Sequence, residues 1–252
     1  MNQFLNTRNL IILQEGASIE LIESTIISST GVRIVQNAYS EILIKDQAHA
    51  SLIIIQQGNS SSALIGRNNV YFSRNSRFDS HTFTLSGAFT RNNLNLYFRD
   101  KGSEAHMNGF YKIGNSEFVD NHTLADHQKS HCISNELYKG ILSGKSNGVF
   151  NGKVFVHPDA QKTNAYQQNN SILLSPEANM NSKPELEIFA DDVKCSHGST
   201  IGQLNADALF YLKARGISEE SGKQLMIRAF AHDITRRLKN EVLQDHINEL
   251  ID

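Results

Sequence analysis

The sequence predicts a mainly β protein, a right-handed parallel β-helix with a C-terminal α-helical domain. Short bursts of alternating apolar and polar residues recur from Ser18 to about His197, and small polar clusters separate them about every ten residues in the first hundred. No tight NG or DG turn joins two clear strands. A sandwich, a barrel and a β-helix all give such bursts, but parallel coils need no hairpins, which favours the β-helix.

The predicted strands follow one another through residues 1–200, the expected β-helix domain. The bursts read SIELIES, EILIKD, ASLIII, TFTLSG, NLNLYF, KVFVHP and ELEIFA. The polar clusters expected to form turns read EGAS, NAYS, KDQAHA, QGNSSS and RDKGSEA. Several strands carry β-branched residues at successive positions, which suits a sheet covered on one side by the core of a coil.

After Gly202 the apolar period changes, and residues 201–252 are predicted to form a helical domain. A short helix is expected from Asn205 to Arg215, with Gly216 as its stop, and Ser218 can cap a second helix. An apolar row predicts that this second helix is long and amphipathic: Met226, Phe230, Ile234, Leu238 and Val242. That row can close the open end of the β-helix, while another face meets a partner.

Composition sets limits on partners and location. The 252 residues include 24 Lys and Arg against 26 Asp and Glu, so the net charge of −2 gives no electrostatic case for nucleic acid or an anionic membrane. The chain shows no membrane-spanning apolar run and no signal peptide, which predicts a cytoplasmic protein. Cys132 and Cys195 are the only cysteines and are expected to be reduced thiols.

Cys195 and His197 form the first candidate site. Two positions apart at a strand end, their side chains leave the same face with Cα atoms roughly 6.5 Å apart, a workable pair of metal ligands. The alternative is that Cys195 is a small buried residue on the face of Val193 and that His197 is a hydrogen-bonded edge residue. Spacing alone favours this second interpretation.

A second group resembles a zinc site only superficially: His122, His127, His131 and Cys132. His122 and His127 are an odd number apart, so in a strand they face opposite ways, and a structural role is expected for the group. Asp191 and Asp192 are the one adjacent acidic pair near a strand end that a carbohydrate-active β-helix enzyme could use. No nucleophile elbow, zinc-protease, P-loop or dinucleotide motif is present.

One long segment carries a family resemblance, KPELEIFADDVKCSHGSTIGQLNADALFYLKARGI from Lys183 to Ile217. With HMNGFYKIG, VDNHTLADH, SNELYKGIL and FNGKVFVHPDAQKTNAYQQNNSILLSP further upstream, it resembles the SufB/SufD family of iron–sulfur cluster assembly, and CSHGST is similar to the SufD branch. The resemblance implies a parallel β-helix core. It also leads us to expect that the helical segment preceding this core in the family is absent.

The resemblance also implies a function. We expect a non-catalytic scaffold that pairs with a SufB-like paralogue, where His197, with Cys195 as a second candidate, contributes to a transient iron–sulfur cluster at the shared interface. A SufC-like ATPase is expected to dock on the helices, through residues Phe210, Tyr211, Arg215, Gly216 and Ile217. No cofactor is expected to stay bound to the isolated chain, because two thiols cannot supply the roughly four ligands that a cluster needs. The alternatives are a SufD-like homodimeric module without a cluster and a carbohydrate-active enzyme.

Overall fold

The computed structural model describes residues 2–27 and 32–251. Fourteen strands of these residues form two sheets, followed by three helices. The odd-numbered sheet contains, in order, β1 (Asn2–Leu13), β3 (Arg33–Ile44), β5 (Ser62–Phe72), β7 (Phe89–Phe98), β9 (Phe118–His127), β11 (Asn147–Val156) and β13 (Asn179–Ile188). The even-numbered sheet contains β2 (Ser18–Ile26), β4 (His49–Gln57), β6 (Arg77–Ser86), β8 (Glu104–Ile113), β10 (Ile133–Leu142), β12 (Asn164–Leu173) and β14 (Lys194–Gly202).

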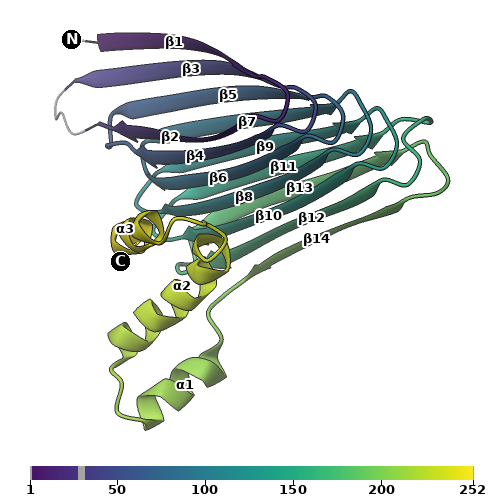
Figure 1. Cartoon of the computed structure of the whole chain (residues 1–252). Coiled ribbons are helices and arrows are strands. Elements are labelled where there is room, and N and C mark those ends of the chain that lie inside the picture. The colour runs from purple at the N-terminus through teal and green to yellow at the C-terminus, as the bar shows by residue number, and fades with distance from the viewer. Residues whose placement is uncertain (1, 28–31, 252) are drawn as a thin grey trace.

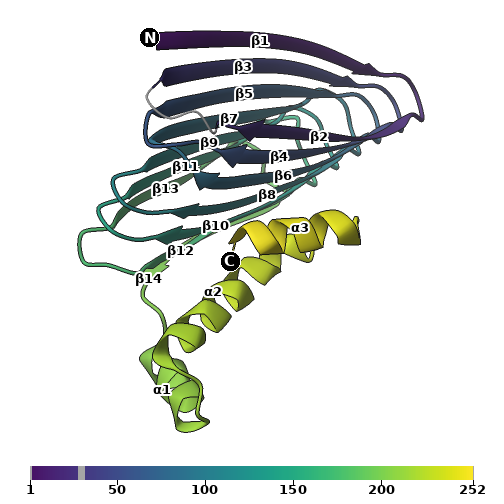
Figure 2. The same cartoon turned by 90° about the vertical axis from the view of Figure 1, so that its left-hand side faces the viewer.

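Every strand pairing within the described residues is parallel, and each strand from β1 to β12 pairs with the second strand after it. The chain therefore winds as a β-solenoid that lays one strand in each sheet per turn (Figures 1 and 2). The hydrogen bond between Asn92 and Asn121, on neighbouring turns, spans 29 residues. The prediction of stacked parallel coils is confirmed.

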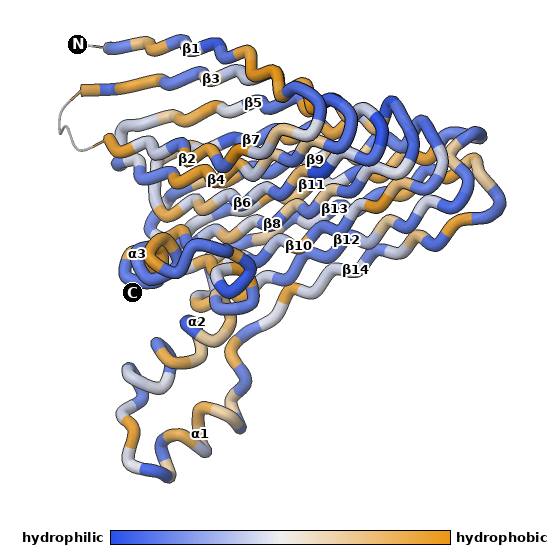
Figure 3. The backbone as a smooth tube through the Cα atoms, in the orientation of Figure 1, coloured by the Kyte–Doolittle hydropathy of each residue, from blue (hydrophilic) through white to orange (hydrophobic). Residues whose placement is uncertain are grey.

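The main core fills the lumen, which we define as the space between the inward faces of the two sheets. Hydrophilic and hydrophobic residues alternate along many of the strands (Figure 3). The hydrophobic side chains that point into the lumen are buried. Phe72, Phe98 and His127 stack on successive turns, with ring centroids 4.6 and 4.3 Å apart. Burial and stacking of such rings stabilise the coil along its axis.

Most of the predicted turns and strands are where the sequence analysis expects them. The seven alternating bursts all contribute to strands, and EGAS, QGNSSS and RDKGSEA lie mainly in the connections between strands. The cluster NAYS is an exception, because it lies inside β3 and not in a turn. Its polar side chains are accommodated there by contacts between turns of the solenoid, including the hydrogen bonds from Asn37 to Asn6 and from Asn69 to Tyr39.

The helices begin as the sequence predicts but end differently. The Asn205 side chain caps α1 (Ala206–Ala214), and the Ser218 hydroxyl caps α2 (Glu219–Thr235). The prediction of one long helix after Ser218 is wrong, because a separate α3 (Glu241–Ile251) follows a turn. The Asn240 side chain accepts a hydrogen bond from the Leu243 backbone N–H at 3.1 Å and so caps α3.

Helices α2 and α3 cover the side of the solenoid and not its end. In α2, Ile227, Ala231 and Ile234 pack against outward-facing apolar residues of the even-numbered sheet: Ile53, Ile55, Phe83, Phe110 and Ile141. Figures 1 and 2 show α2 and α3 beside this sheet, with α1 extending away from it. The prediction that the apolar row closes the open end is therefore wrong, since the sheet has its own outward apolar patch. No described helix is long and apolar enough to cross a membrane.

Candidate functional site

The candidate pair Cys195 and His197 lies on β14, in the last turn of the solenoid. In the part of the chain that the structure describes, β13 and β14 each have a strand on one side only. Cys195 lies beside Ala165 and His197 beside Gln167, both inward-facing residues of β12. Both candidate side chains therefore share the inward face, as their spacing predicts, at the open end of the lumen.

Cys195 is half-buried and packs with Val193 against the inner core. Burial raises the pKa of its thiol. A thiol in this environment has less thiolate character and is a poorer metal ligand than an exposed one. These contacts favour the alternative interpretation, in which Cys195 is a small packing residue.

His197 is exposed at the end of the same row. Two positions further along, the Ser199 hydroxyl donates a hydrogen bond to Ser182 of β13 at 2.8 Å, which ties the two sheets together across the lumen. None of the hydrogen bonds identified among the described residues involves the His197 ring. An accessible imidazole without an internal partner is free to bind a metal or a group on another chain.

Two functional candidates next to His197 were missed by the sequence analysis. Glu136 of β10 and Gln167 of β12 are buried on the inward face, in register with each other and with His197. The Gln167 Nε2 donates to Glu136 Oε2 at 2.8 Å, and burial raises the pKa of the Glu136 carboxyl to about 7. The signal was present in the sequence, since a carboxylate and an amide at core positions of two strands need partners.

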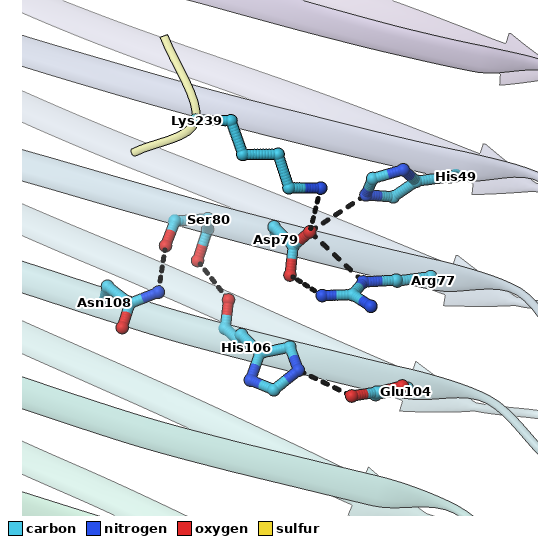
Figure 4. Close-up of polar contacts among 8 residues, drawn as sticks. All are labelled: His49, Arg77, Asp79, Ser80, Glu104, His106, Asn108 and Lys239. Atoms are coloured by element: carbon cyan, nitrogen blue, oxygen red, sulfur yellow. Dashed lines mark hydrogen bonds and ion pairs between the residues drawn. The ribbon is translucent and has the colours of Figure 1, made fainter. Parts of the chain in front are cut away.

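A polar cluster occupies the outer face of the even-numbered sheet near the turn between α2 and α3 (Figure 4). The Asp79 carboxylate accepts hydrogen bonds from Arg77 and His49 at 3.2 and 2.9 Å. Burial opposes ionisation of Asp79, but these hydrogen bonds outweigh it and lower the pKa of the carboxyl. The nearby Arg237 donates to Asn108 at 3.1 Å, so the cluster joins the turn to the sheet.

Two cavities adjoin this outer cluster. One, of about 270 Å³, is bordered by residues that include Arg77, Asp79 and Lys239. The other, of about 500 Å³, shares His106 and Arg237 with it and extends along β10, β12 and β14 as far as His197. His197 is thus approached by open space from the outer side of the sheet as well as from the open end of the lumen.

The structure does not bring the candidate zinc ligands around His122 together into one site. His127 is buried in the lumen, whereas His122 lies on the outer face with its Nε2 2.7 Å from Asp120, so the two face opposite ways as the odd spacing predicts. His131 lies in a turn with a positive φ of 62°. Cys132 is fully buried, and its thiol contacts the Asp100 carbonyl at 3.3 Å. Each residue has a different structural setting.

The acidic pair considered for carbohydrate chemistry lies in the connection between β13 and β14. Asp191 and Asp192 are both exposed, and Asp192 forms an ion pair with Lys162. The Asp192 backbone N–H also donates to Gln161 at 2.9 Å. These contacts tie the connection to the preceding turn and give Asp192 a structural role.

The residues predicted to contact an ATPase gather around α1. Phe210 and Tyr211 have 72% and 57% of their surfaces exposed, and the Arg215 guanidinium lies 5.0 Å from the Tyr211 ring centroid. Gly216 has a φ of 84°, which lets the chain turn sharply between α1 and α2. Ile217 is half-buried in this turn. The helix and turn form a projecting surface with aromatic side chains.

Comparison with known proteins agrees with this solenoid and its terminal helices. The family described as "SUF system FeS cluster assembly, SufBD core domain" matches residues 1–230. The chain belongs to this SufBD core family, and its relatives make it a SufD-like member.

Three relatives illustrate the similarity. The iron–sulfur cluster assembly protein SufD of Escherichia coli is 34% identical over 95% of this chain and 56% of its own length. A SufBD family protein of Synechocystis is 31% identical over 97% of this chain and 55% of its own length. The chloroplastic protein ABCI7 of Arabidopsis thaliana is 30% identical over 95% and 51%. The chain therefore spans about half the length of these relatives.

Proposed function

We propose that this chain is a non-catalytic scaffold subunit in iron–sulfur cluster assembly, which contributes His197 to a cluster site shared with a SufB-like partner. The observation that carries the proposal is the position of His197, exposed on the last strand of the solenoid beside two unpaired strand edges. A partner that pairs with those edges would bring its own side chains next to the imidazole.

The chemistry of the site supports a shared arrangement. An iron–sulfur cluster is normally held by about four ligands, mostly thiolates. This chain offers one accessible imidazole at the site, while Cys195 packs against the core and Cys132 is buried elsewhere. The remaining ligands must come from the partner, and the cluster is cargo that leaves the complex once assembled.

The second part of the proposal is that a SufC-like ATPase docks on α1 and the turn that follows it. Exposed Phe210 and Tyr211 give this surface the aromatic character of a protein interface, and Arg215 adds a charged group beside them. Docking there would act on the rest of the chain through α2, which contacts both α1 and the even-numbered sheet.

The runner-up function is a homodimeric interaction module that binds no cluster. It is favoured by the same unpaired edges of β13 and β14, which a second copy of the chain could pair with.

Co-expression with a SufB-like and a SufC-like partner, followed by anaerobic purification, tests the proposal. We expect the complex with unmodified His197 to carry iron, sulfide and broad visible absorption, and His197→Ala to lose most of the cluster while the subunits stay associated. His246→Ala, which removes an exposed histidine of α3, is the matched control and should keep the cluster. Full cluster content in the His197→Ala complex would leave the chain as a structural brace.

A further inference from the structure

The buried pair behind His197 has one polar atom that the fold leaves without a partner. Glu136 and Gln167 are 5% and 3% exposed, yet Gln167 Oε1 makes no hydrogen bond among the described residues. A buried hydrogen-bond acceptor without a partner destabilises a fold, so this oxygen requires a functional explanation.

The register of the solenoid places this pair directly behind the candidate ligand. Glu136 lies beside Gln167, and Gln167 beside His197, on three neighbouring parallel strands of the same sheet. Neighbouring strands are about 4.8 Å apart, and all three side chains share the inward face. Gln167 is therefore the residue between the buried carboxyl and the exposed imidazole.

The orientation of the Gln167 amide is fixed by its surroundings. Its Nε2 donates to Glu136 Oε2 at 2.8 Å, so the carbonyl oxygen is left for another donor. Gly152 of β11 admits the side chain from the opposite sheet, because a Cβ at Gly152 would lie 2.3 Å from Gln167 Nε2. The amide is thus held between an acceptor on one strand and a glycine on the facing sheet.

We propose that Gln167, oriented by Glu136, is a positioning residue that accepts a hydrogen bond from one ring N–H of His197 and so selects its tautomer. The structure itself does not contain this bond, which forms when the His197 ring turns toward the lumen and then satisfies the Gln167 carbonyl oxygen. It leaves the other ring nitrogen unprotonated and available as a ligand. Metal-binding histidines usually have their second ring nitrogen held by such a partner. The inference rests on the proposed function of His197, but the hydrogen bond itself belongs to this chain alone.

The hydrogen bond is tested on the full isolated chain, by nitrogen NMR of the His197 ring at a pH where the imidazole is neutral. We expect one dominant tautomer in the unmodified chain and a mixture of tautomers in Gln167→Met, which keeps the side-chain length without the carbonyl. Gln168→Met is the matched control, because Gln168 is exposed on the outward face of the same strand, and it should match the unmodified chain. Equal tautomer populations in Gln167→Met and the unmodified chain would overturn the inference.

Substitutions of Glu136 test how Gln167 is oriented. Glu136→Gln keeps an oxygen that accepts from Gln167 Nε2 and should preserve the His197 tautomer. Glu136→Leu removes the acceptor, lets the amide reverse, and should shift the populations toward those of Gln167→Met. If Glu136→Leu has no effect on the tautomer, Glu136 does not orient Gln167, and that part of the inference fails.

The consequence for ligation is measured in the co-purified complex. Loss of a residue that orients a metal ligand typically costs 10–100-fold in metal affinity, so Gln167→Met should weaken cluster retention by about tenfold or more against a chelator. Unchanged retention would overturn the positioning role. If instead His197→Ala retains the full cluster while Gln167→Met alters the tautomer, the proposed function fails and the hydrogen bond stands.

Discussion

Glu136 should make the free energy of unfolding depend on pH. Burial raises the pKa of its carboxyl from 4.5 to about 7 in the folded chain. Between those values the folded state binds more protons than the unfolded state, so the free energy of unfolding falls as pH rises from about 4.5 to 7. The loss is on the order of 3 kcal/mol for a fully buried group.

Glu136→Gln should abolish this loss, because the amide does not titrate. We expect the variant to gain stability over the unmodified chain as pH rises through that window, measured by urea unfolding at pH 5 and pH 8. Buried His81 and His127, whose pKa values burial lowers to about 4 and about 3, contribute the opposite slope to both proteins. The difference between the two proteins therefore isolates Glu136, and a difference independent of pH would contradict the prediction.

Cys132 should behave as a structural residue. It is fully buried in the core, and burial raises the pKa of its thiol, which lowers its reactivity. Cys132→Ala removes packing atoms and should lower the free energy of unfolding by about 1–2 kcal/mol. Cluster content of the assembled complex should not change. A loss of cluster at unchanged stability would reassign Cys132 to the assembly site.

At the scale of strands and helices, alternation was the most reliable signal in the sequence. Every alternating burst contributes to a strand, because a strand with one buried face must alternate. NAYS was mistaken for a turn because contacts between turns of the solenoid satisfy polar residues within β3. These contacts join residues about thirty positions apart, which local sequence does not encode.

Local sequence was also insufficient to predict how the C-terminal helices end and where they pack. In the sequence, apolar residues repeat every four positions through Leu238 to Val242. The structure interrupts this row, because Asn240 caps a new helix and Val242 is 80% exposed. The cap was visible in the sequence, whereas the outer apolar patch that receives α2 depends on strands more than 70 residues earlier. At the candidate site, the two-residue spacing of Cys195 and His197 predicted that their side chains share one face of a strand. The pairing of Glu136 with Gln167 required the register between turns.

Glycines inside the solenoid should be intolerant of substitution where an aromatic ring from a neighbouring turn occupies the space that a Cβ would need. A Cβ on Gly140 of β10 would lie 2.0 Å from the Tyr111 ring, which is itself buried. Gly140→Ala should lower the free energy of unfolding by about 1–3 kcal/mol through overpacking. Gly198 of β14 is the control, because a Cβ there meets nothing within 4 Å. Equal effects in denaturant unfolding would contradict this account.

At the scale of the whole molecule, the isolated chain should purify colourless. The described residues contain no group of three or more His, Cys, Asp or Glu side chains placed to hold a metal ion. The two cysteines have different settings, one buried and one half-buried. We therefore expect neither visible absorption nor stoichiometric iron under anaerobic purification. A stable chromophore in the chain alone would contradict a site shared with a partner.

Isolated copies of the chain should also self-associate through the open end formed by β13 and β14. This end presents unpaired strand edges together with exposed apolar residues: Ile188, Phe189 and Ile201. Unpaired edges favour pairing with another chain, and two identical edges can meet around a two-fold axis. Light scattering at micromolar concentration should give the mass of a dimer.

A lysine at the open end should prevent this association, because a charge at a strand edge opposes pairing. We expect Ile201→Lys to be monomeric. Val242→Lys, which places the same charge at an exposed position on α3, should remain dimeric. The Ile201→Lys chain should also fail to join a SufB-like partner if both associations use the same edge. A dimer that tolerates Ile201→Lys would move the interface away from the end of the solenoid and from His197.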